Sequence, residues 1–234
     1  MHSLVLRRIV PYLVAVSFSS CTKDETSLSS SSPPAKETAT DSGFVIRHEY
    51  IELEKIDRIS KFRSGIGHDY SDDSEDCRSM KHYYQPKNSV TWSSVKIFSP
   101  VSGTVVRIVD EWAGTQVQIQ PFIYSSYTVI IFHVAVQRSL AVGDTVTAGE
   151  QLGTHAGVQT MSDIAIGFSA QNQWRLVSYF DLISDSLFQQ YRQRGIVSRN
   201  DLIITKQARD ADPLNCNGET FGTEGTLSNW GVLH

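Results

Sequence analysis

The segment GHDYSDDSEDCRSMKHYY, residues 67–84, contains two histidines, five acidic residues and a cysteine within eighteen positions. Imidazole and carboxylate groups bind divalent metals and also transfer protons, so the segment could support either chemistry. His68 and Asp72 form an H-x-x-x-D pair, which would supply two zinc ligands or simply a carboxylate that orients an imidazole. Calcium is disfavoured, because the acids lack EF-hand spacing and no glycine stands at the turn. The alternative is a solvated loop held by a disulfide.

The segments that follow have the composition of β-strands. Residues 95–100, 103–112, 115–122, 127–136 and 162–169 are rich in Val, Ile, Thr and aromatic residues and are bounded by Gly, Ser or Pro. Residues 44–54 alternate apolar and polar side chains and predict a further strand, and 140–153 predict a turn, a short strand and another turn. His133 lies near the end of one such segment, where it is either a core histidine or part of a cleft.

Two helices are predicted after the strands. The first, at 174–195, has apolar residues at helical spacing: Phe180, Ile183, Leu187 and Tyr191. The second, at 198–211, opens with a capping-box-like Ser and Asp and is followed by Pro213. The predicted fold class is therefore mainly β. A β core at 44–172 carries an inserted polar loop at 67–94, and a helical extension with an irregular tail follows at 173–234.

Residues 97–153 resemble the β core of the lysostaphin/LytM-type zinc endopeptidases. The pieces that match are SPVSGTV, FHV around His133, and LAVGDTVTAGEQLG, in the family's order and spacing. The resemblance implies a β-sheet core of the barrel-sandwich hybrid type. A biotinyl- or lipoyl-carrier domain shares part of the last phrase but needs a modifiable lysine, and residues 108–175 contain none.

The same resemblance implies a set of site residues. The family hydrolyses peptide bonds, mostly in bacterial cell walls, with one zinc held by the His and Asp of an H-x-x-x-D motif and by the second His of an H-x-H motif. His68 and Asp72 match the first motif, and His133 matches a histidine that assists the zinc-bound water. The H-x-H motif falls on DIAIGF, where Asp163 replaces the first His and Ala165 replaces the ligand.

Because alanine cannot coordinate zinc, the resemblance predicts an incomplete site with His68 and Asp72 as its remaining ligands. Asp163 could substitute for the third ligand, but it lies two residues away, roughly 6–7 Å along a strand. His155 and His82 are further candidates without a spacing argument. We therefore expect no cofactor. The alternative is an active zinc endopeptidase with a rearranged ligand set.

The N-terminal residues predict export. Arg7 and Arg8, an apolar run and small residues precede Cys21, an arrangement that resembles the lipobox of bacterial lipoproteins, although Phe18 departs from its usual aliphatic residue. Residues 1–21 are therefore predicted to be a lipoprotein signal with Cys21 lipidated, and a plain secretory signal is the alternative. The Ser-, Thr- and Pro-rich residues 22–43 predict a flexible tether. The expected location is the outer membrane or the cell surface, through the lipid anchor.

Cysteine content and charge add two further expectations. Cys77 and Cys216 would form a disulfide in an oxidising compartment, although two free thiols are the alternative. A net charge of −4 gives no basic surface for nucleic acid. Six aromatic residues are either core residues or a platform that stacks on glycans: Trp92, Trp112, Trp174, Tyr70, Tyr83 and Tyr84.

These observations favour an envelope lipoprotein with a peptidase-like core that has lost zinc catalysis. It would act as a binding or regulatory module for cell-wall peptide, glycan or a partner hydrolase. An active zinc endopeptidase and a purely structural lipoprotein are the two alternatives.

Overall fold

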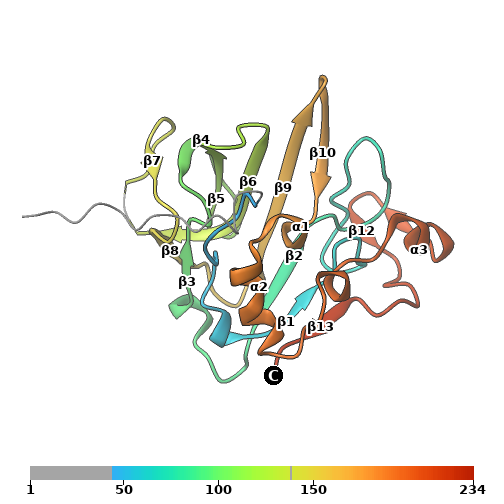
Figure 1. Ribbon diagram of the computed structural model, residues 1–234. Helices are drawn as coiled ribbons and strands as arrows, with labels where there is room; N and C mark the ends of the chain where they lie inside the picture. Colours follow the sequence, from blue (N-terminus) through green and yellow to red (C-terminus); the bar gives the residue numbers. More distant parts are fainter. Residues whose placement is uncertain (1–43, 138) are drawn as a thin grey trace, which may run out of the picture. The chain divides into compact units, whose positions relative to one another are not determined.

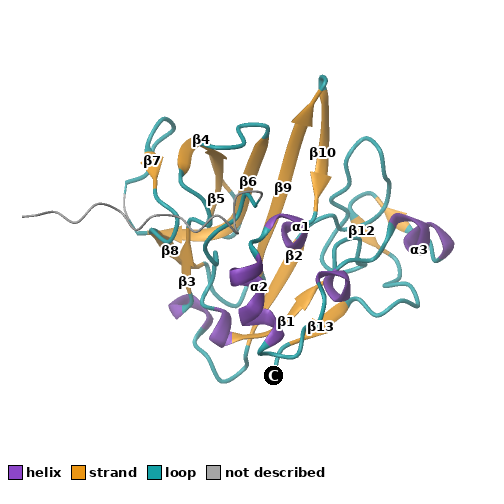
Figure 2. Cartoon of the chain, in the orientation of Figure 1, coloured by secondary structure: helices purple, strands orange, loops and turns teal. Residues whose placement is uncertain are grey.

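The computed structural model describes residues 44–137 and 139–234. The predicted signal peptide, the tether and the lipidation site Cys21 lie outside these residues. Within them the chain is mainly β, as predicted (Figures 1 and 2). No helix in this described part is long and apolar enough to cross a membrane.

One antiparallel sheet contains most of the strands. Its main path runs through β13 (Trp230–Val232), β1 (Ile56–Ser60), β2 (His82–Pro86), β9 (Ser162–Ala170), β6 (Tyr127–Val136), β5 (Thr115–Pro121), β4 (Gly103–Asp110) and β7 (Thr145–Val146). Three strands branch from this path: β10 (Gln173–Val177) pairs with β9, and β8 (Gln151–His155) joins β6 to β3 (Lys96–Phe98). A separate pair consists of β11 (Cys216–Asn217) and β12 (Thr220–Phe221).

Two predicted segments differ from the structure at the N-terminal side. Residues 44–54 form no strand, because the chain contacts 96–100 irregularly, with Ile46 and Ile51 in isolated bridges. The predicted loop 67–94 contains β2, which lies between β1 and β9 in the sheet. Four of the five β2 residues are buried, so the strand shows none of the apolar–polar alternation on which strand prediction depends.

The predicted helices are each divided in two. The first consists of α1 (Tyr179–Leu182) and α2 (Asp185–Arg192), because Ile183 is extended and the Ser184 hydroxyl accepts a hydrogen bond from Leu187 N–H to cap α2. The second consists of a 3₁₀ helix (Arg199–Leu202) and α3 (Lys206–Ala211), separated where Ile203 pairs with Phe62. Two further 3₁₀ helices lie at Leu53–Lys55 and Trp92–Ser94.

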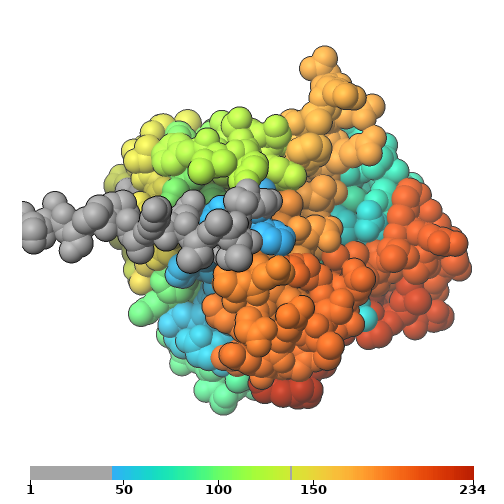
Figure 3. Space-filling view, in the orientation of Figure 1, coloured from blue at the N-terminus to red at the C-terminus, as the bar shows by residue number. Residues whose placement is uncertain are grey.

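The sheet also continues past the predicted boundary at residue 172. Gln171 and Asn172 have positive φ angles of 51° and 63°, which make the tight turn between β9 and β10. The tip of this hairpin stands out from the surface in Figure 3. Trp174, predicted to begin a helix, therefore lies on β10, where it covers Gly167.

The two faces of β9 are buried against different residues. Ile164 and Ile166 belong to the main core, which also includes Phe180 of α1 and Tyr191 of α2. Ala165 faces the other way, into a smaller apolar cluster with Ile130 and Phe132 of β6, Phe62, Met80 and Leu176. Asp163 shares this second face because strand side chains alternate. The candidate site lies beside the smaller cluster.

Candidate functional site

A buried lysine, Lys81, stands at the centre of the residues that the sequence singles out. It directly precedes β2, and its side chain is 2% exposed. Its Nζ lies 2.5 Å from Asp163 Oδ2 and 3.1 Å from His68 Nε2. Three aromatic rings surround the ammonium with their centroids 4.2–4.9 Å away: Tyr70, Tyr83 and Phe132. A buried ammonium needs such partners, because its desolvation is costly.

Asp163 supplies the compensating charge from β9. Its side chain is fully buried, and none of the hydrogen bonds among the described residues is accepted by its carboxylate oxygens. The contact with Lys81 is therefore an ion pair that carries most of the compensation. β-Sheet register brings these groups together, since Tyr83 is paired with Asp163 and Lys81 projects on the same face two residues earlier.

His133 approaches Asp163 from β6. Its φ angle of +56° is unusual for a residue inside a strand, and the β5–β6 register shifts nearby, between Thr115 and Val117. His133 Nε2 lies 3.4 Å from Asp163 Oδ1. Its Nδ1 lies 2.8 Å from the Ala113 carbonyl oxygen and 3.3 Å from Glu111 Oε2. Nδ1–H donates to the Ala113 carbonyl oxygen, and Nε2 faces the Asp163 carboxylate.

His68 contributes a nitrogen acceptor from the opposite side. Its Nδ1 donates to the Asp69 carbonyl oxygen at 2.9 Å, which leaves Nε2 as the acceptor for the Lys81 ammonium. The imidazole of His68 is 42% exposed at the mouth of the site. The structure thus places His68 and Asp163 against a lysine that no motif indicated, and His133 beside Asp163.

Asp72, the predicted partner of His68, lies in a different hydrogen-bond network. Its Oδ2 accepts from Leu176 N–H at 2.7 Å, and its Oδ1 accepts from the Ser74 N–H and hydroxyl at 2.8 and 2.6 Å. Burial alone would raise the pKa of the Asp72 carboxyl, but the hydrogen bonds from Ser74 and Leu176 outweigh it and lower the pKa below its usual value. Asp72 therefore anchors its loop to β10 and contacts neither Lys81 nor His68 through a hydrogen bond or ion pair among the described residues.

The other candidate ligands are also engaged elsewhere. His82 Nδ1 lies 2.8 Å from the Ser60 carbonyl oxygen and its Nε2 lies 3.0 Å from Ser178 Oγ, and burial lowers its pKa to about 4. His155 is fully buried, its Nδ1 accepts from Gly157 N–H at 2.9 Å, and burial lowers its pKa to about 4 as well. Ala165 lies in the apolar cluster. Both histidines are thus neutral structural groups near neutral pH.

The zinc ion that the family resemblance implies does not fit this arrangement. Across 44–137 and 139–234, no three His, Cys, Asp or Glu side chains are grouped so that they could share an ion. A zinc ligated by His68 and Asp163 would lie about 2.0–2.2 Å from each donor atom. The Lys81 ammonium already fills the space between those two donors.

An open cleft of about 470 Å³ lies above the Lys81–Asp163 pair. Its floor and walls include His68, Tyr70, Phe132, His133 and Glu111, and the exposed Trp112 and Glu219 lie at its rim. The Trp112 side chain is 74% exposed and its ring lies 5.8 Å from that of His133. The cleft therefore combines aromatic surface with an acidic rim.

The six aromatic residues that were considered either core residues or a stacking platform are dispersed. Tyr70, Tyr83 and Trp112 line the cleft, whereas Tyr84 is buried in the main core on the opposite face of β2. Trp92 packs against His155, and Trp174 lies on the β9–β10 hairpin. They do not form one continuous platform, and Trp112 is the member that the cleft exposes most.

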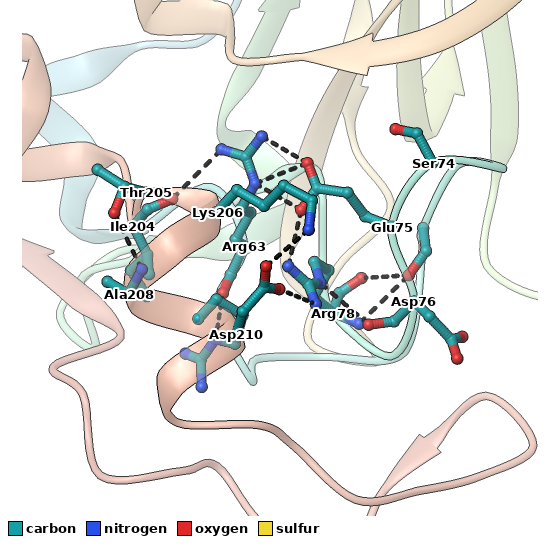
Figure 4. A network of polar contacts seen from close by, with 12 residues as sticks. Arg63, Ser74, Glu75, Asp76, Arg78, Ile204, Thr205, Lys206, Ala208 and Asp210 are labelled. Atoms are coloured by element: carbon teal, nitrogen blue, oxygen red, sulfur yellow. Dashed lines mark hydrogen bonds and ion pairs between the residues drawn. The ribbon is translucent and has the colours of Figure 1, made fainter.

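A charged network holds the loop that carries His68 (Figure 4). The Glu75 carboxylate accepts from Arg63 at 2.6–2.9 Å and from Arg78 at 2.7 Å, and its side chain is 4% exposed. Arg78 also donates to Asp210 of α3 at 2.9 Å, and Lys206 pairs with the same carboxylate. The loop is thereby fixed against α3, although the two segments are far apart in sequence.

Cys77 and Cys216 form a disulfide in the structure, with their Cα atoms 5.8 Å apart. The bond joins the same loop to β11, next to the β-turn that carries Glu219 at the cleft rim. The cleft wall is therefore tied at two places, by the charged network and by the disulfide.

Comparison with known proteins gives a limited likeness. No protein-family profile and no curated protein matches the sequence. Among solved structures, the chain is similar to LytM of Ruminococcus gnavus, assigned as a glycyl-glycine endopeptidase, with 15% identity and a TM-score of 0.35 over 44% of this chain and 43% of that one. It is similar to lysostaphin, with 13% identity and a TM-score of 0.32 over 50% of this chain and 51% of that one. The SpoIIQ–SpoIIIAH pore-forming complex gives 12% identity and a TM-score of 0.42 over 63% of this chain and 98% of that one. The chain spans less than half the length of the LytM structure.

Proposed function

We propose that this chain is an exported, lipid-anchored protein of the cell envelope whose peptidase-like cleft binds cell-wall peptide or glycan without zinc catalysis. The observation that carries the proposal is the Lys81–Asp163 ion pair at the floor of an open cleft. The charged pair lies beside His68, the one predicted zinc ligand that lines the cleft, while the space above it remains accessible to a ligand.

The requirements of zinc hydrolysis support the proposed loss of zinc catalysis. A catalytic zinc needs three protein ligands and an open position for the water that it acidifies. Of the predicted ligands, His68 accepts a hydrogen bond from Lys81, Asp72 is bound to Leu176 and Ser74, and position 165 is an alanine. These three positions therefore do not supply the ligand set that zinc-dependent peptide hydrolysis requires.

The lining of the cleft supports the proposed binding of cell-wall peptide or glycan. Exposed aromatic side chains at a cleft rim are favourable contact surfaces for sugars and peptides, because they bury area with little loss of side-chain entropy. Trp112 offers such a surface. The carboxylate of Glu219 at the rim, 85% exposed, can accept hydrogen bonds from the amide, amine or hydroxyl groups that cell-wall peptide and glycan carry.

The test is sedimentation of the full-length protein with purified insoluble cell wall, with and without a chelator. We expect the protein to sediment with the wall, no soluble fragments to be released, and the chelator to have no effect. Trp112→Ala should weaken binding about tenfold, whereas the control Trp174→Ala, which alters a partly exposed indole on the β9–β10 hairpin, should leave it unchanged.

Three outcomes would contradict this function. Chelator-sensitive release of wall fragments would establish the active zinc endopeptidase. Absence of sedimentation would refute wall binding, as would capture of a wall hydrolase by a protein that does not bind the wall itself. Equal binding by Trp112→Ala and wild type would place the ligand outside the cleft.

A further inference from the structure

We infer that the edge of the sheet opposite the cleft rests on a phospholipid bilayer, with Phe122 and Ile123 of the β5–β6 turn inserted at its surface. This apolar edge consists of the turn, residues 122–126, and the tip of the β9–β10 hairpin, residues 171–175. The inference rests on the proposed lipid anchor at Cys21, and it does not depend on what the cleft binds.

Two adjacent apolar side chains of the β5–β6 turn face solvent. Phe122 is 58% exposed and Ile123 is 63% exposed. They adjoin an open pocket of about 200 Å³, whose lining includes Val45, Val101 and Pro121. Single exposed apolar residues are common on protein surfaces, whereas an adjacent pair beside an apolar pocket forms a patch that indicates a contact surface.

The turn is held in place by its own contacts. Phe122 N–H donates to the Ser102 carbonyl oxygen at 3.0 Å, and the Gln120 side-chain amide donates to the Ser125 carbonyl oxygen at 2.8 Å. Tyr124, which has a φ angle of +67°, packs against the main core. The exposed pair is therefore presented by an ordered turn, and binding requires little further ordering of the backbone.

The chain enters the domain next to this pocket. The described residues begin at Phe44, and Val45 and Arg47 line the pocket beside the turn. Cys21, the predicted site of the lipid, is 23 positions before Phe44, so the domain stays within roughly 80 Å of the bilayer even at full extension. A tethered surface acts at a high effective concentration, which makes a contact of two side chains sufficient. The positive charge of Arg47 suits the phosphates of lipid headgroups.

The size and surroundings of the patch favour lipid over a second protein. Its two side chains expose on the order of 200 Å², whereas a stable protein interface covers about 800 Å² on each partner. The hairpin belongs to the same edge, because Ser169 N–H donates to the Ser126 carbonyl oxygen at 2.8 Å. It carries two exposed residues of the types found at the boundary between water and lipid, Trp174 and Arg175.

Docking on this edge directs the cleft away from the membrane. The turn follows Pro121 at one end of β5, whereas Trp112 at the cleft rim precedes Thr115 at the other end. The seven residues of β5 span about 20 Å. On β9, Asp163 lies near the start and the hairpin follows the last residue, Ala170. The bilayer and the cleft ligand thus contact opposite ends of the same strands.

The test places a nitroxide label on the full-length protein, exported, processed and reconstituted into vesicles of phosphatidylethanolamine and phosphatidylglycerol. One label is attached at Ser125→Cys on the turn. The control label is attached at Val158→Cys, a 79% exposed position on the loop that leads to the cleft-lining residues 160 and 161. We expect a water-soluble nickel chelate to collide with the Ser125 label about tenfold less often than with the Val158 label. Phe122→Ser/Ile123→Ser should bring both labels to the same collision rate.

Mass spectrometry of the same preparation reports acyl groups on Cys21, so the anchor and the edge are judged separately. If Cys21 carries the lipid and the two labels collide equally, the inference is wrong while the anchor stands. An unmodified Cys21 refutes the anchor and the inference with it, whereas wall sedimentation continues to test the cleft. Shielding that persists in the double variant assigns the cover to another segment, and shielding that disappears on dilution of the protein in the vesicles assigns it to a second copy. Either result overturns the inference.

Discussion

Two buried carboxyl groups lie on opposite faces of the same pair of strands and are accommodated in different ways. Asp163 lies on the cleft side of β2 and β9 and pairs with the Lys81 ammonium. Glu49 lies on the main-core side and accepts hydrogen bonds from the hydroxyls of Tyr179 at 3.1 Å and Tyr191 at 2.6 Å. Burial raises the pKa of Glu49 from 4.5 to about 7, although the two tyrosine hydrogen bonds oppose this shift.

The difference shows what a buried carboxyl group requires. Asp163 has a cation at short range, whereas the neutral hydroxyl donors around Glu49 offset only part of its desolvation, so Glu49 retains its proton to a higher pH. Because side chains alternate along β2, different groups are available to compensate the carboxyl group on each face. Lys81 and Tyr83 project to the cleft, and His82 and Tyr84 project to the core.

Removing the cation should produce the largest effect. Lys81→Met keeps most of the side-chain volume but leaves Asp163 buried without a counter-charge, so we expect the free energy of unfolding at pH 7 to fall by about 3–5 kcal/mol in urea titrations. Lys206→Met, which disrupts an exposed pair, should cost less than about 1 kcal/mol.

The double variant Lys81→Met/Asp163→Asn separates the charge from the contact. It should recover most of the lost stability, because a buried pair replaced as a whole costs far less than one broken. Equal stability loss in the single and double variants would show that packing around Lys81, and not the uncompensated carboxylate, determines the effect.

The Glu49 site should give a smaller, pH-dependent effect. Since the folded state binds the Glu49 proton more tightly than the unfolded state, its contribution to stability is fully present below pH 4.5 and is lost as the pH rises to about 7. Glu49→Gln does not titrate; its carbonyl oxygen accepts from one tyrosine hydroxyl and its amide donates to the other, so it should gain on wild type by up to roughly 3 kcal/mol across that range.

Comparing the two proteins pH by pH isolates Glu49. His82 and His155 have pKa values lowered to about 4, so their contribution is lost in the opposite direction, as the pH falls from 6.5 to 4. That contribution is common to both proteins and cancels in the difference. A difference that stays constant between pH 4.5 and 7 would mean that Glu49 is ionised in the folded protein throughout.

His68 should contribute least to the cleft charge balance. Its imidazole is a half-exposed second partner of Lys81, so His68→Ala should lower the free energy of unfolding by about 1 kcal/mol. The measurement is a urea titration at pH 7, beside Lys81→Met. A loss as large as that of Lys81→Met would reverse the order of importance that the distances indicate.

The strands were predictable from the sequence because they are rich in β-branched residues and bounded by Gly, Ser or Pro. This pattern predicted the strands of the second half of the sheet, and with them the location of His133 and Asp163 on two of these strands. β2 was missed because its residues are buried on both faces. Lys81 was missed for a related reason: a lysine carries no periodic signal, and its partner on β9 is identified only once the β2–β9 register is known.

The H-x-x-x-D pair shows the opposite difficulty. The spacing of His68 and Asp72 matches a metal-binding motif, but spacing in a loop does not determine where the side chains point. Asp72 instead accepts hydrogen bonds from Leu176 and Ser74. The Ser74 contacts follow a local turn pattern, whereas the Leu176 contact joins residues 104 positions apart, which no local pattern predicts.

The disulfide has a consequence for the order of events during biosynthesis. Cys77 and Cys216 are 139 residues apart, and β1 at the start of the described sheet pairs with β13 near its end. Contacts this distant in sequence form late, since closing a long loop is entropically unfavourable. A nascent chain that has produced β2 and β9 can already pair Lys81 with Asp163, whereas the wall of the cleft awaits Cys216. We therefore expect the floor of the cleft to form before its wall, and a chain that stops before residue 216 to lack the disulfide that ties the wall.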